Sequence, residues 1–146
     1  MHLWIGAKKM MLPNFTIAYG CVLAMALLPV VCAGIAKSGM MRTPPGEGGY
    51  DNADPRSWLL RQTEWRARAN NAQANTFEAL PFFFAAVIIA HQLQASQARV
   101  DVLAVVFVAL RLAYVAAYVA NKANLRSAIW MLALLVNVAL LFAGFR

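Results

Sequence analysis

The chain has 146 residues, of which 62% are hydrophobic and 13% are charged, and its formal net charge is +7. Soluble proteins average about 45–50% apolar and about 25% charged residues, so this composition excludes an ordinary soluble domain. The length allows a single domain. The positive charge does not indicate a nucleic-acid partner, because the sequence carries no soluble module with interleaved basic and aromatic residues.

Four long stretches without formal charge predict an all-α membrane protein, a four-helix bundle that runs up-down-up-down. The first stretch, between Lys9 and Lys37, contains 27 uncharged residues, and a crossing needs about 20. It is too long for the core of a cleaved signal peptide, so we expect a retained helix. The four expected spans are residues 12–36, 72–94, 100–121 and 127–145.

Residues 37–54 are predicted to form the main loop outside the membrane. Pro44, Pro45 and the three glycines of residues 46–49 interrupt regular structure there, and no Gly-Lys-Ser/Thr follows that would indicate a phosphate-binding loop. Asp54 and Pro55 are typical of a helix N-cap and a first helical position. We therefore expect a helix over residues 55–71 that continues without a break into the second span.

The basic residues outside the spans are divided unequally between the two sides of the membrane. The first and third loops carry eight of them: Lys37, Arg42, Arg56, Arg61, Arg66, Arg68, Lys122 and Arg126. The termini and the second loop carry four: Lys8, Lys9, Arg99 and Arg146. Because cytoplasmic loops are enriched in Lys and Arg, we expect both of these loops to be cytoplasmic and both termini to face outward.

Polar side chains inside the predicted spans form a cluster between the second and third helices. A charged side chain at membrane depth costs about 2.5–3.5 kcal/mol on insertion scales, so it indicates a partner or a function. Spacings of three and four residues put two sets on one helical face each: Asn71, Asn75 and Glu78, and Arg111, Tyr114 and Tyr118. Two interpretations remain open. One is a buried Glu78–Arg111 ion pair that fixes helix register, and the other is a pocket for an anionic ligand entering from the cytoplasm.

Three further features of the spans are interpreted as structural. Asn137, deep in the fourth span, is expected to hydrogen-bond between helices. His91 is expected to be an interfacial side chain, and no His, Cys, Asp and Glu group in the sequence has the spacing of a metal site. Cys21 and Cys32 would lie about 16 Å apart along one helix, beyond the reach of a disulfide.

The order and spacing of the polar residues resemble those of a known membrane protein family. The residues are Asn75-x-x-Glu78-x-x-Pro81, then Arg111-x-x-Tyr114-x-x-x-Tyr118, then Arg126-Ser127 with Trp130. Over about residues 55–146 this pattern resembles the membrane-associated proteins in eicosanoid and glutathione metabolism (MAPEG), most closely the small bacterial members. The resemblance implies a left-handed four-helix bundle assembled as a homotrimer, and it favours the bacterial inner membrane.

The resemblance also implies a co-substrate and a set of site residues. Glutathione would lie between neighbouring subunits near the cytoplasmic face. Its binding residues would be Asn75, Glu78, Tyr114 and Tyr118, and the catalytic residues would be Arg126 and Ser127. Arg126 would stabilise the glutathione thiolate, because a nearby cation lowers the pKa of a thiol and the thiolate is the nucleophile. Ser127 would offer a hydroxyl to the same sulfur.

Two hypotheses about function remain open. The first, favoured by Arg126 and Tyr118, is a glutathione-dependent transferase or peroxidase that acts on lipophilic electrophiles dissolved in the bilayer. The second is a non-catalytic member that binds lipid or serves as an accessory subunit of a larger inner-membrane complex. Asn71 favours the second, since glutathione-binding relatives carry an arginine there, which pairs with a glutathione carboxylate. Arg66 or Arg68 is the alternative source of that cation.

Overall fold

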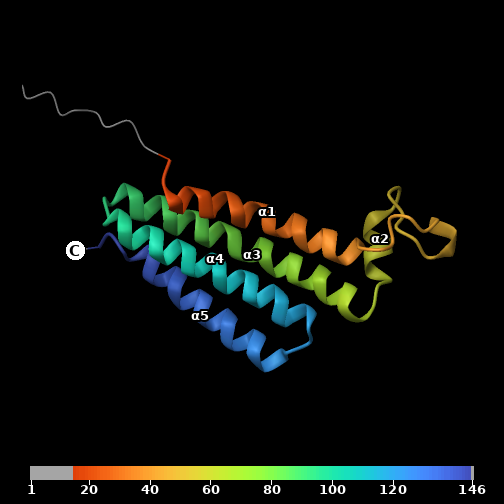
Figure 1. Ribbon diagram of the computed structural model, residues 1–146. Coiled ribbons are helices and arrows are strands. Elements are labelled where there is room, and N and C mark those ends of the chain that lie inside the picture. Colours follow the sequence, from red (N-terminus) through yellow and green to blue (C-terminus); the bar gives the residue numbers. More distant parts are fainter. Residues whose placement is uncertain (1–14, 146) are drawn as a thin grey trace, which may run out of the picture.

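The computed structural model describes residues 15–145, and these residues form a four-helix bundle (Figure 1). Its long helices are α1 (Ile17–Lys37), α3 (Glu64–Gln92), α4 (Gln97–Val119) and α5 (Ala123–Leu141). Each runs antiparallel to the one before it, so the predicted all-α, up-down-up-down architecture is confirmed. The short helix α2 (Pro55–Leu60) and a 3-10 turn, η1 (Pro45–Glu47), lie at one end of the bundle, termed the loop end.

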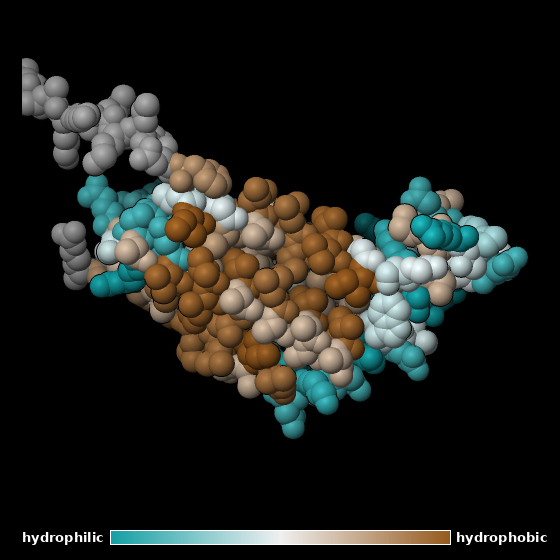
Figure 2. Space-filling view, in the orientation of Figure 1, coloured by the Kyte–Doolittle hydropathy of each residue, from teal (hydrophilic) through white to brown (hydrophobic). Residues whose placement is uncertain are grey.

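All four long helices are long and apolar enough to cross a membrane. The shortest, α5, has 19 residues, which at 1.5 Å per residue is about 28 Å, close to the thickness of the hydrocarbon core. Hydrophobic side chains cover the middle of the visible face of the bundle, and hydrophilic side chains gather at its two ends (Figure 2). Lys8, Lys9, Arg146 and the first three residues of the expected span 12–36 lie outside the described residues.

Small side chains in the core let the helices approach one another closely. Ala72, Ala86 and Ala104 are fully buried. Phe83 of α3 stacks on Phe107 of α4, with ring centroids 4.3 Å apart. Helix α1 packs on α3 and α4, and α5 packs against α4 and α3 from the opposite side (Figure 1). Close packing of this kind holds a bundle together in lipid, where the hydrophobic effect contributes little between helices.

Local signals determine where the helices begin. The Thr16 hydroxyl accepts a hydrogen bond of 3.3 Å from a backbone N–H in the first turn of α1 and caps that helix. Asn121 adopts φ +59°, the left-handed conformation that asparagine tolerates, and turns the chain from α4 into α5. Because this turn is so short, α5 begins at Ala123, one turn before the expected start at residue 127.

The loop between α1 and α3 is held by tertiary contacts. Trp58 of α2 is 2% exposed, and its indole N–H donates to the Gly48 carbonyl at 3.2 Å. Tyr50 packs edge-on against this indole, with ring centroids 5.3 Å apart, and its hydroxyl accepts from Lys37 Nζ at 2.9 Å. The segment expected to be irregular therefore has a defined course and includes the turn at Pro45–Glu47.

The expected continuous helix from residue 55 into the second span is wrong, because residues 61–63 separate α2 from α3. The Trp58 carbonyl accepts from the Arg61 backbone N–H at 3.2 Å and from Gln62 Nε2 at 3.0 Å, whereas a continuing helix would supply the backbone N–H of Gln62. Helix α2 consequently turns away from the axis of the bundle (Figure 1), and its tryptophan reaches the loop.

At the opposite end of the bundle, His91 packs among side chains of α1. Its ring stacks on Tyr19 with centroids 4.6 Å apart, and its Nε2 lies 3.3 Å from the Thr16 hydroxyl. Cys21 and Cys32 are buried free thiols. Among residues 15–145, no three His, Cys, Asp or Glu side chains are placed to hold a metal ion.

Candidate functional site

A cleft of about 260 Å³ opens in the loop-end half of the bundle, where α3, α4 and α5 meet. Its lining side chains are Asn75, Tyr114, Tyr118, Arg126, Ser127 and Trp130. We term it the Arg126 cleft. Five of the six site residues expected from the sequence therefore lie together in one place, and Trp130 joins them.

Two arginines and two tyrosines form a ladder along this cleft. The guanidinium carbon of Arg126 lies 4.3 Å from the ring centroid of Tyr118. Tyr118 meets Tyr114 edge-on with centroids 5.6 Å apart, and the guanidinium carbon of Arg111 lies 4.4 Å from the Tyr114 centroid. Both arginines lie within the roughly 6 Å of a ring centroid that a cation–π contact requires. The ladder therefore fixes two cations beside the cleft, an arrangement suited to an anionic ligand.

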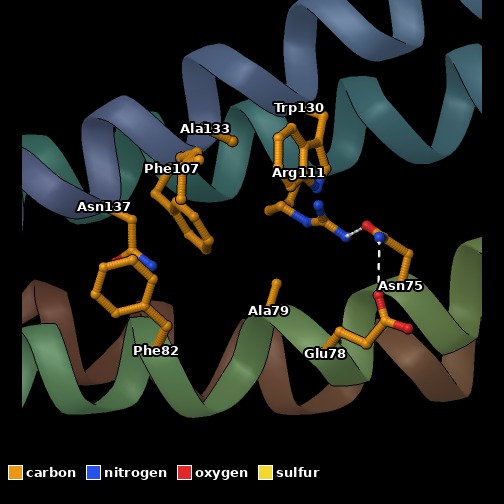
Figure 3. Close-up of a pocket in the computed structure, with 10 residues that line it drawn as sticks. Asn75, Glu78, Ala79, Phe82, Phe107, Arg111, Trp130, Ala133 and Asn137 are labelled. Atoms are coloured by element: carbon orange, nitrogen blue, oxygen red, sulfur yellow. Dashed lines mark hydrogen bonds between the residues drawn. The ribbon is translucent and has the colours of Figure 1, made fainter.

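Arg111 is connected to α3 through Asn75 and Thr76. The Arg111 side chain is 1% exposed, and its Nη2 donates to Asn75 Oδ1 at 3.1 Å and to Thr76 Oγ1 at 3.3 Å. Asn75 Nδ2 donates in turn to Glu78 Oε2 at 3.1 Å (Figure 3). The expected direct Glu78–Arg111 ion pair is thus corrected to a relay through Asn75, whose amide carries both an acceptor and donors.

A second cavity adjoins the cleft and shares Asn75 and Trp130 with it. Its volume is about 160 Å³, and it lies between α3 and α5 against the inner face of α4. Glu78, the sixth expected site residue, lines this cavity and not the cleft. Asn137 and Phe82 lie at the end far from Arg111 (Figure 3). We term it the Asn137 cavity.

Besides Trp130, two polar residues of this region were not predicted as site residues. Thr76 is fully buried, and its hydroxyl donates to the Ala72 carbonyl at 2.7 Å while accepting from Arg111. Asn137 is 2% exposed, and its carboxamide oxygen has no hydrogen-bond partner within residues 15–145, contrary to the helix–helix bond expected for it. Thr76 could have been found as a hydroxyl next to Asn75 at membrane depth, whereas the state of Asn137 depends on the packing of several helices.

The cations that could replace the family arginine also lie at the loop end. Asn71, at the position of that arginine, is exposed on α3. Arg68 Nε donates to the Val119 carbonyl at 3.0 Å, and Val119 directly follows Tyr118 of the cleft. Arg66 Nη2 instead donates at 3.0 Å to the backbone carbonyl just after α1. Arg68 is therefore the cation nearer to the rim of the cleft.

Comparison with known protein families identifies the chain. The family model for MAPEG matches residues 17–146, nearly the whole chain. The chain belongs to the MAPEG family. No curated protein and no solved structure matches it. Family membership and the four apolar helices together make this MAPEG protein a multi-pass membrane protein.

Proposed function

We propose that this MAPEG protein is a glutathione-dependent membrane transferase or peroxidase acting on lipophilic electrophiles that dissolve in the bilayer. The observation that carries the proposal is the Arg126 cleft, where six side chains of the family pattern converge from three helices. Family membership supports glutathione as the co-substrate. Glutathione is a net anion, and the ladder holds two cations, Arg111 and Arg126, whereas the carboxylate hydrogen-bonded to Asn75 is that of Glu78.

In this proposal Arg126 stabilises the reactive form of glutathione. The thiolate is the nucleophile, and a free thiol with a pKa near 8.5 is mostly protonated at neutral pH. A guanidinium beside the sulfur favours the charged form, and the Ser127 hydroxyl donates to the same sulfur. The thiolate then forms a bond to the electrophilic carbon, and the leaving group departs with the electron pair of the bond that breaks.

The remaining side chains bind the peptide part of glutathione. Asn75 supplies an amide, and Tyr114 and Tyr118 supply hydroxyl groups that can donate to carbonyl or carboxylate oxygens. Arg68 supplies the carboxylate-binding cation that the family arginine, here replaced by Asn71, would supply. The hydrogen bond from Arg68 Nε already holds the Arg68 side chain against the end of α4 beside Tyr118.

A homotrimer in the bacterial inner membrane completes the proposal. Glu78 is exposed on a single chain, and an uncovered carboxylate at membrane depth is costly, so a neighbouring copy is expected to cover it. Native mass spectrometry in mild detergent should give three copies, and monomers or dimers would contradict the trimer.

Loops one and three are cytoplasmic in this proposal, so a Glu47→Cys variant should react with an impermeant thiol reagent in inverted vesicles and not in intact cells.

Arg126→Ala tests the catalytic assignment. The wild-type protein with saturating glutathione should show the ultraviolet absorbance of a bound thiolate at neutral pH. The Arg126→Ala variant should lose this signal while keeping its helical circular dichroism. Arg126→Lys keeps the charge without the planar fork and should retain part of the signal. Lys122→Ala, which removes a neighbouring cation that does not line the cleft, is the matched control and should behave as wild type.

The second candidate is a non-catalytic accessory or lipid-binding subunit, which Asn71 in place of the family arginine favours. The same absorbance experiment separates the two candidates. If the wild-type protein shows no thiolate signal with saturating glutathione, the enzyme assignment fails and the accessory function replaces it.

A further inference from the structure

The Asn137 cavity contains an amide group that its own chain leaves unsatisfied. Asn137 lines the cavity, is 2% exposed, and has no hydrogen-bond partner for its carboxamide oxygen within residues 15–145. Buried polar groups are almost always hydrogen-bonded, because an unpaired one loses its hydration without compensation. Inside a membrane such a group indicates a function. We therefore expect the Asn137 amide to form a hydrogen bond with a group from outside the chain.

The surroundings of this amide are apolar and aromatic. Phe82 and Phe107 line the cavity together with Asn137 (Figure 3). The cavity volume of about 160 Å³ is close to that of a known cavity of about 150 Å³, lined by Leu, Ile and Phe, that stays dry and binds benzene. The space thus suits an aromatic ring or a short branched chain, with one polar contact available at Asn137.

We propose that the Asn137 cavity binds an apolar ring or chain end that carries a neutral hydroxyl group, and that Asn137 selects for this hydroxyl. A half-turn of the carboxamide exchanges its oxygen and nitrogen, and a hydroxyl can both donate and accept, so the two groups match in either orientation. A methyl group in the same place would leave the amide unpaired. Sites built around a buried polar group reject ligands that lack the matching group.

The charge distribution in the cavity favours a neutral group at this end. Arg111 lies at the opposite end, beside Asn75 and Trp130 (Figure 3). An anionic group would be drawn toward that guanidinium and away from Asn137. Because Asn75 and Trp130 also line the Arg126 cleft, the other end of the ligand would point toward the cleft. The identification of this ligand as the electrophile attacked by glutathione rests on the proposed function. The binding of the ligand to the Asn137 cavity does not.

Two probes of nearly equal size, para-fluorophenol and para-fluorotoluene, test the selection because they differ only in a hydroxyl in place of a methyl group. Each is titrated into the full-length protein in detergent micelles without glutathione, and binding is followed by fluorine NMR after correction for partition into protein-free micelles. We expect the phenol to bind wild type on the order of tenfold more tightly. Asn137→Leu should abolish this preference. Asn124→Leu, the same change at an exposed position of α5, should preserve it.

Equal affinity of the two probes for the wild-type protein would overturn the proposal. Failure of both to bind saturably, as expected if water or a neighbouring subunit fills the cavity, would also overturn it. The comparison on wild type needs no variant, so it decides the matter even if Asn137→Leu does not fold. A hydroxyl preference without a glutathione thiolate signal would reject only the proposed function, and the reverse result would reject only this inference.

Discussion

Asn75 connects the parts of the polar cluster. It accepts from the buried Arg111 guanidinium, donates to the Glu78 carboxylate, and lines both the Arg126 cleft and the Asn137 cavity. The Arg111 side chain makes only one other hydrogen bond among the described residues, to Thr76, and its Nε has no partner. A single amide thus supports a buried cation and the shape of the candidate site.

Asn75→Leu should lower the free energy of unfolding by about 1.5–3 kcal/mol, the range for a hydrogen bond to a charged group, because Arg111 keeps only its bond to Thr76. Denaturation in mixed micelles, followed by circular dichroism, measures the change. Asn71→Leu, at an exposed position one turn earlier on α3, is the control and should have little effect. Strictly additive effects of Asn75→Leu and Arg111→Met in a double-mutant cycle would show that the relay does not couple the two residues.

The sequence predicted which residues meet here better than how they are bonded. Helical spacing places Asn75, Glu78 and Arg111 on facing helices at compatible depth, and the family pattern names the same residues. Spacing does not determine side-chain rotamers, however, so it could not show that the Asn75 amide lies between the two charges. The sequence also could not show that the Asn137 amide is unpaired, because this depends on whether the packed helices place a hydrogen-bond partner near it.

At the scale of the elements, α2 shows how a local signal and a distant contact combine. Asp54 and Pro55 start the helix as the sequence predicts, and the Asp54 carboxylate accepts from the Ser57 backbone N–H at 3.3 Å. Hydrogen bonds from Ser57 lower the pKa of the Asp54 carboxyl. The end of α2 was not predictable in the same way, because it depends on the burial of Trp58 against a loop ten residues earlier.

The cap at Asp54 should make α2 sensitive to acid. Because the folded-state pKa lies below the unfolded value of about 3.9, the cap stabilises α2 above that value and is lost as the pH falls through the folded pKa. Hydrogen exchange of the α2 amides, corrected for intrinsic rates, should accelerate in this acidic range. Asp54→Asn retains an N-cap acceptor that does not titrate and should remove the pH dependence. If the variant keeps the wild-type pH profile, the cap is not responsible.

The long helices were predictable because a bilayer leaves few alternatives. Every backbone polar group inside the hydrocarbon must be bonded within the protein, so uncharged stretches of sufficient length become helices. The lengths of uncharged stretches do not locate features of only a few residues, such as the turn at Asn121 and the break at residues 61–63. Charge gaps therefore located four helices, but α5 starts one turn before the expected span, and the separation of α2 from α3 was not predicted.

At the scale of the whole molecule, the bundle combines an apolar belt with a polar interior at one end. Hydrophobic side chains cover the middle of the face shown in Figure 2, whereas the Arg126 cleft lies among polar side chains of α3, α4 and α5 in the loop-end half. The adjoining Asn137 cavity extends from this polar region between aromatic side chains. Such an arrangement would let a water-soluble thiol and a lipid-soluble partner reach one another from different phases.

The central claim is that the Arg126 cleft binds glutathione as its thiolate. Isothermal titration of the purified protein with glutathione, in two neutral buffers of different ionisation enthalpy, measures the affinity and the number of protons released together. We predict saturable binding with release of roughly one proton per glutathione, because a thiol that is mostly protonated in water becomes a thiolate in the cleft. The absence of saturable binding, or binding with the same heat in both buffers, would contradict the claim.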